Sequence, residues 1–302
     1  MHRDTLGAAT RSNHLRGVLL ATAGVLFFVP DTTLIRLADA RDLQITFWRS
    51  LFIGSALVAV VAARHGARTA LAYRAIGVPG VAVGLAWGTG FVLFVYAVNH
   101  TAVANVLVIL ATMPLFAALF TRVLIGEVIH RRTWLAMLAA GGGVALTFAS
   151  ALRLGGLDGN LAALAVAAIF GLNLTMIRRS GEIDMLPAVS IAGFVAAGLV
   201  LAGAWPVGIA AHDVLVIGVN GFVLVPAALA LLAVGARYLP SPQVSLLMMI
   251  ETVFGPLLAW LVVHEQPPPF AAAGGVIVVG TLAAHFIAAL RDESDLPAPS
   301  TS

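Results

Sequence analysis

Residues Arg237 to Glu265, RYLPSPQVSLLMMIETVFGPLLAWLVVHE, decide the fold of this chain. The stretch is apolar over most of its length, carries the acid Glu251 near its middle and ends on a second acid. An earlier stretch, Asn99 to Glu127, is organised in the same way: NHTAVANVLVILATMPLFAALFTRVLIGE. When the two are superimposed, Glu127 falls on Glu265. Two copies of one unit indicate a duplicated membrane protein with a site between its halves.

The composition places almost the whole chain in lipid. Of its 302 residues, 60% are hydrophobic and 10% are charged, whereas a soluble domain has about 25% charged residues. The absence of cysteine excludes disulfide bonds and thiol chemistry. Motifs for nucleotide hydrolysis, serine hydrolases and zinc proteases are also absent. We therefore expect no enzyme activity, cofactor, metal site, nucleotide or nucleic acid, and as partners only the lipid bilayer and a small-molecule substrate.

Ten segments are apolar enough to cross a bilayer core about 30 Å thick, which takes about 20 residues of helix. These spans are 16–37, 45–63, 76–98, 101–126, 134–151, 160–178, 187–209, 214–235, 240–263 and 270–290. We assign residues 1–15 to an N-terminal tail, 16–152 and 153–290 to two five-helix repeats, and 291–302 to a C-terminal tail. Because each repeat has an odd number of spans, the second is inserted upside down. This predicts an all-α membrane protein of inverted repeats around a central cavity.

The arginines predict the orientation, because cytoplasmic loops are enriched in basic residues and every basic residue here is arginine. With the N-terminus inside, the inner loops and tails hold Arg3, Arg11, Arg16, Arg64, Arg68, Arg74, Arg131, Arg132, Arg178, Arg179, Arg237 and Arg291. The outer loops hold only Arg36, Arg41 and Arg153. Both termini are therefore expected in the cytoplasm, and the membrane is expected to be a bacterial inner membrane.

A second alignment extends the repeat to the start of each half. Leu26–Arg36 matches Ala168–Arg178, with Thr33 over Thr175. Span 1 therefore pairs with span 6, as span 4 pairs with span 9.

Two motifs carry a resemblance to a known family. Spans 4 and 9 end on LIGE at Leu124–Glu127 and VVHE at Val262–Glu265, and a glycine run follows each acid. Met113-Pro114 also corresponds to Glu251-Thr252. With these motifs, residues 16–290 resemble the ten-helix, EamA-like group of the drug/metabolite transporter superfamily. The chain departs from the family's pattern, which has Glu-Pro at the position of Glu251-Thr252 and tryptophan near Phe28.

The resemblance implies that spans 1, 3, 4, 6, 8 and 9 surround the cavity and that spans 5 and 10 lie outside it. The size and aromatic-rich centre look most like bacterial exporters of aromatic and other amino acids. The expected function is export of amino acids, aromatic and other apolar ones included, or of related small metabolites, by alternating access. The alternative is efflux of hydrophobic cationic drugs. A non-transporting scaffold or an intramembrane enzyme is the alternative of another class.

Glu251 is the leading candidate for transport chemistry. It lies about ten residues into span 9, hence about 15 Å deep, near the bilayer centre. An acid there costs roughly 2.5–3.5 kcal/mol and should face a partner or water. It could bind a substrate ammonium or couple transport to protons, or it could be a structural acid bonded to a neighbouring helix. By contrast, we expect Glu265 to fix loop geometry and Asp31 to reach water.

The predicted substrate-binding residues are Phe28, Trp87, Phe91, Asn105, Asn173, Ser245, Met248, Glu251 and Thr252. The aromatic side chains could wall a cavity or pack helices together. The asparagines place amides in lipid, where they seek a partner on another helix or on a substrate. Ser245, Met248 and Thr252 belong to one small or polar stripe on span 9, which suits either close packing or a cavity lining.

Proline interrupts four of the predicted spans. The predicted hinges are Pro30, Pro114, Pro226 and Pro256. Each proline removes a backbone donor and frees the carbonyl four residues earlier, so the helix can kink there. Such kinks serve either gating or packing.

Overall fold

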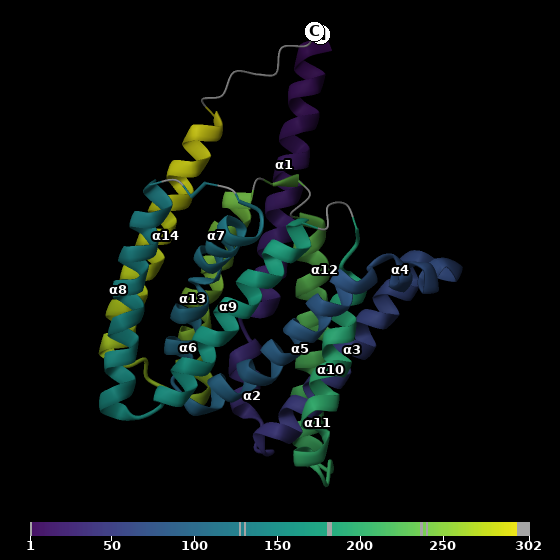
Figure 1. Ribbon diagram of the computed structural model, residues 1–302, viewed down its shortest axis with the longest axis vertical. Coiled ribbons are helices and arrows are strands. Elements are labelled where there is room, and N and C mark those ends of the chain that lie inside the picture. Colours follow the sequence, from purple (N-terminus) through teal and green to yellow (C-terminus); the bar gives the residue numbers. More distant parts are fainter. Residues whose placement is uncertain are drawn as a thin grey trace.

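The computed structural model describes residues 2–126, 128–129, 131–179, 183–235, 238–239 and 241–294. Throughout these residues the regular structure is helical, and none of them forms a strand. Nine described helical segments are long and apolar enough to cross a membrane. The remaining long helix of the bundle, α8 (Arg131–Leu154), lies beside α14 (Pro269–Ser294) (Figure 1). The chain is thus an all-α membrane protein, as its composition predicts.

Each predicted span corresponds to one helix or to one interrupted helix. Span 1 comprises α1 (His2–Phe28) and α2 (Asp31–Leu37), and span 4 comprises α6 (Val103–Leu110) and α7 (Met113–Leu124). Spans 2, 3, 6 and 7 are α3 (Asp42–His65), α5 (Gly77–His100), α9 (Leu157–Arg179) and α10 (Leu186–Ala204). Span 8 comprises α11 (Ala211–Gly218), the π-helix η2 (Val219–Leu224) and α12 (Val225–Gly235), and span 9 is α13 (Ser241–Val263). Between α3 and α5 lie the short helices η1 (Gly66–Arg68) and α4 (Thr69–Ala75).

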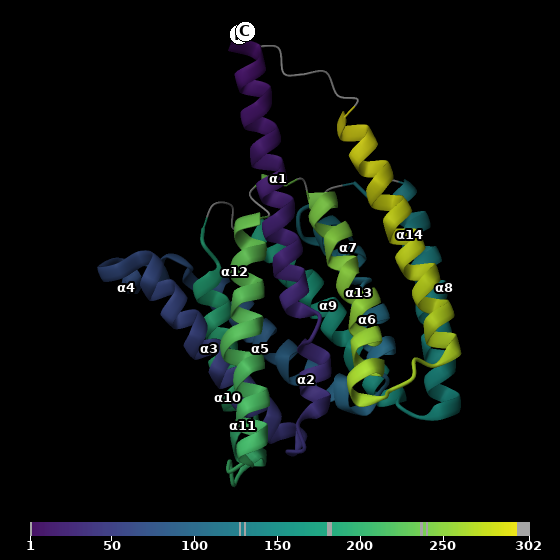
Figure 2. The ribbon, with the colours of Figure 1, turned by 180° about the vertical axis from the view of Figure 1, so that it is seen from behind.

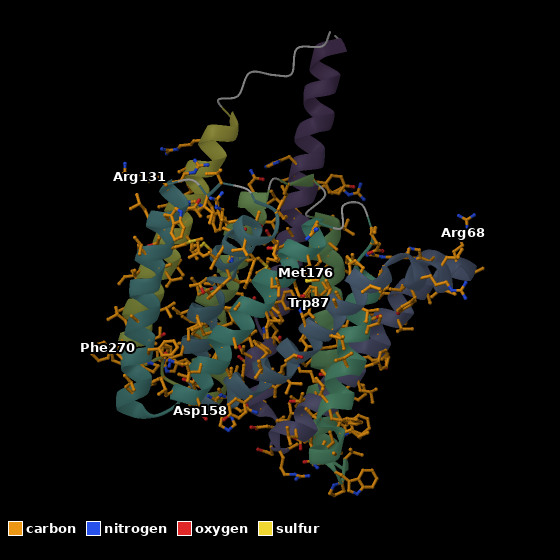
Figure 3. The ribbon with its side chains drawn as sticks, in the orientation of Figure 1. Arg68, Trp87, Arg131, Asp158, Met176 and Phe270 are labelled. Atoms are coloured by element: carbon orange, nitrogen blue, oxygen red, sulfur yellow. The ribbon has the colours of Figure 1, made fainter. Side chains whose placement is uncertain are left out.

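The first spans of the two halves run in opposite directions. We call the end of the bundle at which α1 begins and α14 ends the terminal end, and the opposite end the distal end (Figures 1 and 2). Span 1 runs from the terminal to the distal end, whereas α9 begins at the distal end, where Asp158 lies (Figure 3). This is the inversion that an odd number of spans per repeat requires.

The main contacts between spans of the two halves have counterparts in which the roles of the halves are interchanged. Helix α1 packs against α12, and its repeat counterpart α9 packs against α5. Likewise, α9 packs against α7, as α1 packs against α13. Helices α3 and α10 are counterparts that pack against each other, and so are α8 and α14. The bundle is therefore one five-helix arrangement used twice, and its central contacts join the two halves.

Facing glycines bring these last two pairs of helices close together. A Cβ on Gly193 of α10 would lie 2.6 Å from the backbone nitrogen of Gly54 on α3. A Cβ on Gly274 of α14 would overlap the carbonyl oxygen of Gly143 on α8. Small residues at such crossings let the backbones of membrane helices approach each other, since lipid supplies no hydrophobic force between them.

The orientation in the membrane is a prediction that introduced cysteines can test. We expect Arg68→Cys and Arg131→Cys, near the terminal end, to react with an impermeant maleimide only after the cells are opened. Cysteines replacing Asp39 and His212, at the distal end, should react in intact cells. All four native residues are exposed, and the chain has no cysteine of its own to give a background. Labelling of residue 68 in intact cells would show that the orientation is the opposite of the predicted one.

Candidate functional site

Three buried polar side chains from three spans form one cluster, which we call the charged cluster: Asp31, Arg49 and Asn220. Arg49 Nη2 donates to Asp31 Oδ1 and Oδ2 at 2.9 and 2.8 Å. Arg49 Nε donates to Asn220 Oδ1 at 2.9 Å, and Asn220 Nδ2 donates to Asp31 Oδ1 at 2.7 Å. The side chains of Arg49 and Asp31 are 3% and 5% exposed, so each charge depends on the other for compensation. The expectation that Asp31 reaches water is wrong.

Irregular backbone holds two members of the charged cluster. Asp31 begins α2 directly after the break at Pro30, and Asn220 lies in the π-helix η2. Asn220 Nδ2 also lies 3.2 Å from the backbone carbonyl of Asp31, to which it donates. The cluster therefore joins span 1 and α3 of the first half to span 8 of the second. In membrane transporters, broken helices at the interface of the repeats commonly carry the binding site.

Aromatic rings flank the guanidinium. Arg49 Cζ lies 5.8 Å from the ring centre of Phe91 and 5.4 Å from that of Phe94, both on α5. At these distances the ring faces attract the cation. Phe91 in turn meets Phe170 of α9 edge to face, with ring centres 6.4 Å apart. The charged cluster thus continues into an aromatic cluster.

The structure brings four of the predicted site residues together in this aromatic cluster. Phe28, Trp87 and Phe91 pack around one buried core with Phe170, and the Trp87 and Phe170 ring centres are 5.8 Å apart. Asn173 follows Phe170 by one helical turn, so the two share a face of α9. Asn173 is 1% exposed, and neither of its amide atoms has a hydrogen-bond partner. An unpartnered buried amide costs about 1–3 kcal/mol, which marks this place as one that a polar ligand group or water could complete.

Trp87 also packs beside Met176 and Ile177, one turn beyond Asn173 on α9. Trp87 therefore contacts α9 both before and after Asn173, on the face that carries this asparagine. Figure 3 shows Trp87 and Met176 near the centre of the bundle.

Glu251 lies in the middle of α13, where that helix passes α2. One turn later, a Cβ on Gly255 would lie 3.9 Å from Thr32 Oγ1, so this face of α13 points toward the start of α2. Helices α13 and α2 pack against each other, which places Glu251 near the segment that Asp31 begins. Among the described residues, Glu251 makes no hydrogen bond and no ion pair, and its side chain is only partly buried. An acidic side chain without a partner among these residues therefore adjoins the charged cluster.

The other predicted residues of α13 surround Glu251 on the same helix. Ser245, Met248 and Thr252 are partly buried, as residues at the edge of a helix contact are. The side chain of Ser241 and the whole of Glu127 lie outside the described residues.

Asn105 belongs to a different place, near the distal end. It is buried and donates from Nδ2 to Thr101 Oγ1 at 3.0 Å. Together with Arg36 and Glu265 it lines a cavity of about 430 Å³. A second cavity of about 450 Å³ is apolar and lies between α3 and span 8, around Phe52 and Phe222. Of the predicted substrate-binding residues, only Asn105 lines either cavity.

Glu265 connects the two halves at the distal end. Its Oε1 accepts a hydrogen bond from the backbone nitrogen of Val103 at 2.6 Å, at the start of α6. Its Oε2 lies 3.1 Å from Arg36 Nη2, which also donates to the carbonyl of Thr101 at 2.6 Å. His264, with φ of 57°, turns the chain immediately before Glu265. These contacts agree with the role of fixing loop geometry.

Further polar contacts between the halves accompany this pair. Arg41 donates to the carbonyls of Ala204 and Trp205, Gln44 to those of Pro206 and Gly208, and Trp48 to that of Val207. Tyr96 donates to Asp158, and the backbone of Asp39 donates to Asp213. These contacts hold the two halves together at the distal end.

One group of described residues has the composition of a metal site, although we expected none. The potential ligand atoms of Asp39, His212 and Asp213 all lie within 4.8 Å of one another. The buried Asp213 carboxylate, however, already accepts from the Asp39 backbone at 2.9 Å and lies 3.4 Å from His212 Nδ1. The group thereby joins the turn after α2 to the start of α11, and the absence of a metal site stays a prediction.

Of the predicted hinges, three coincide with irregular helix. The break between α1 and α2 contains Pro30, Pro114 lies in the first turn of α7 just after a break, and Pro226 follows the π-helix. Helix α13 instead continues through Pro256. Because proline removes only one backbone donor, neighbouring turns can carry the helix past it. Whether any of these sites acts as a hinge stays a prediction.

Sequence comparisons agree with this architecture. The model of the EamA-like transporter family matches the chain twice, at residues 15–149 and 157–286. Among curated proteins, none matches the sequence. A solved crystal structure, described only as that of a protein, is 18% identical, covers 94% of this chain and 99% of its own, and superposes with a TM-score of 0.61. This likeness shows the shared fold.

Proposed function

We propose that this chain, which belongs to the EamA-like transporter family, exports aromatic and other apolar amino acids. Membership in that family makes it a membrane transporter of small solutes and not an enzyme. The observation that carries this proposal is the continuity between the charged cluster and the aromatic cluster, through the ring of Phe91. An aromatic amino acid has the same two parts, a charged backbone end and an apolar ring.

Export by alternating access would use the contacts between the halves. With cytoplasmic termini, the distal end faces outward, so release of substrate would require the contacts of Glu265 with Arg36 and Val103 to open. The substrate would then leave toward the cavity that Asn105 and Arg36 line. The breaks at Pro30 and before Pro114 supply places where spans 1 and 4 can bend.

Transport in reconstituted vesicles tests this function. Vesicles loaded with unlabelled phenylalanine should accumulate labelled phenylalanine, tryptophan or leucine by exchange, and protein-free vesicles should not. The partly buried acid Glu251 in the middle of α13 would also suit a hydrophobic cation, so a labelled lipophilic cation belongs in the same panel. Exchange of the cation without exchange of any amino acid would replace amino acid export by drug efflux.

Trp87→Ala should weaken transport of large aromatic substrates selectively. The change removes a ring that packs against Phe170, so the KM for tryptophan should rise about tenfold while that for alanine changes little. Trp260→Ala is the matched control, because that side chain is 47% exposed on the outside of α13. Equal losses for all substrates, together with a lower Tm, would show that Trp87 serves only helix packing.

A further inference from the structure

One of the three nitrogens of the Arg49 guanidinium has no hydrogen-bond partner. A guanidinium has five N–H donors, and here Nε and Nη2 serve Asp31 and Asn220. The remaining nitrogen, Nη1, is buried without a partner. Unsatisfied donors on a buried cation are costly, so an acceptor from a water or a ligand would stabilise Nη1.

Acidic side chains outnumber basic ones around Arg49. The nearby acids are Asp31 on α2 and Glu251 on α13, and both are negative when ionised, whereas Arg49 on α3 supplies a single positive charge. Asp31 is paired with Arg49, but Glu251 has neither hydrogen bond nor ion pair among the described residues. The group thus offers one unpartnered acid to an additional cation, and one unused pair of donors to an anion. A zwitterion carries both.

The partners of Arg49 lie on backbone that can change its shape. Asp31 follows the break in span 1, and Asn220 lies in the π-helix of span 8. Such segments move relative to their regular neighbours at small cost, and they are frequent at functional sites. Arg49 itself lies within the regular helix α3. Movement of span 1 or span 8 would therefore expose the guanidinium without disturbing the helix that carries it.

We infer that the substrate binds by exchanging ion pairs with the charged cluster. The α-carboxylate of an amino acid takes Arg49, beginning at Nη1, while the α-ammonium takes the carboxylates of Asp31 and Glu251. The side chain then extends past Phe91 toward Trp87 and Phe170, where the aromatic cluster begins. The substrate carboxylate takes the place of Asp31 at Arg49, and the substrate ammonium takes the place of Arg49 at Asp31. A ligand must therefore carry both a negative and a positive charge. This inference rests on the proposed function and adds the residues that bind the carboxylate and the ammonium of the zwitterion.

Three ligands that share one phenyl ring test the exchange by isothermal titration calorimetry on the purified protein. They are phenylalanine, 2-phenylethylamine without the carboxylate, and 3-phenylpropanoate without the ammonium. The unaltered protein should bind phenylalanine at least about tenfold more tightly than either analogue. Asp31→Asn leaves Arg49 without its anion, so it should bind 3-phenylpropanoate at least about tenfold more tightly than the unaltered protein does. Arg49→Gln should instead favour 2-phenylethylamine.

A control and a neutral variant make the result decisive. Arg68→Gln removes an exposed charge on η1, so it should leave the ranking of the three ligands unchanged. If neither single variant folds, Asp31→Asn/Arg49→Gln removes both charges together, which a folded interior tolerates better than one unpaired charge. Loss of the preference for phenylalanine in this double variant supports the exchange.

Two results would overturn the inference. An unchanged ranking in Asp31→Asn, or a retained tenfold preference for phenylalanine in the double variant, would make the charged cluster purely structural. Failure of the unaltered protein to bind any of the three ligands would instead reject the proposed function itself.

Discussion

Replacing Glu251 with glutamine is expected to abolish most transport while leaving the protein at least as stable as before. Glutamine keeps the size of the side chain and replaces an acid that has no hydrogen bond or ion pair among the described residues. Since an acid in the middle of a span costs roughly 2.5–3.5 kcal/mol, its neutral analogue should not lower the Tm. Loss of a charged contact to the substrate, of about 1.5–3 kcal/mol, should reduce kcat/KM by roughly tenfold to more than a hundredfold.

The comparison with Glu265 makes this prediction specific. Glu265→Gln weakens the ion pair with Arg36 and the hydrogen bond from Val103, so it should lower the Tm. The two acids should thus respond in opposite ways when exchange in vesicles and thermal unfolding in detergent are measured side by side. Normal transport by the Glu251 variant would show that this carboxylate neither binds the substrate nor couples transport to protons.

The second large effect concerns the stability of the charged cluster. Asp31→Leu should destabilise the protein by about 3–5 kcal/mol, because it leaves Arg49 buried with no opposite charge. Adding Arg49→Met removes that charge, and the double variant should recover most of the lost stability. Asn220 keeps one acceptor in both variants, since Nδ2 also donates to the backbone carbonyl of residue 31. Thermal unfolding of the four forms gives the coupling energy directly.

Matched changes at an exposed pair provide the control. His100 and Asp42 approach to 3.4 Å with about a third of each side chain exposed, so their coupling should stay within about 1 kcal/mol. A coupling of this small size between Asp31 and Arg49 would contradict their dependence on each other.

The spans could be predicted from the sequence because a bilayer imposes a local requirement. A helix must be apolar for about 20 residues whatever lies beside it, so hydropathy alone indicates where α3, α5 and α9 cross. The repeat could also be detected from the sequence, because equivalent spans end on an acid, as span 9 does at Glu265. Which helices touch is not a local property. The pairing of α3 with α10, for example, depends on Gly54 and Gly193 meeting across the two halves.

The candidate site was predicted in part. Trp87 and Phe91 of α5 meet Phe170 of α9, one turn before Asn173, because both spans face the interface between the halves. The charged cluster was missed, although its signal was present: an acid directly after Pro30 and an arginine within the next span. Pairing them requires knowledge of the break between α1 and α2. That break is held by Asn220, which lies 189 residues further along the chain.

The π-helix of span 8 makes the residue count of this span as important as its composition. Between Val219 and Leu224 the helix turns by less per residue than an α-helix does, which sets the direction of Asn220 relative to α12. Deleting one residue there would let the segment return to α-helical winding, which keeps the two ends of the span in nearly the same relative direction but redirects the side chains between them, that of Asn220 included. Lipid-facing side chains such as Phe222, which is 53% exposed, can vary without this consequence. Homologous chains that keep the charged cluster should therefore differ freely in the outward residues of span 8 but show neither insertions nor deletions within it.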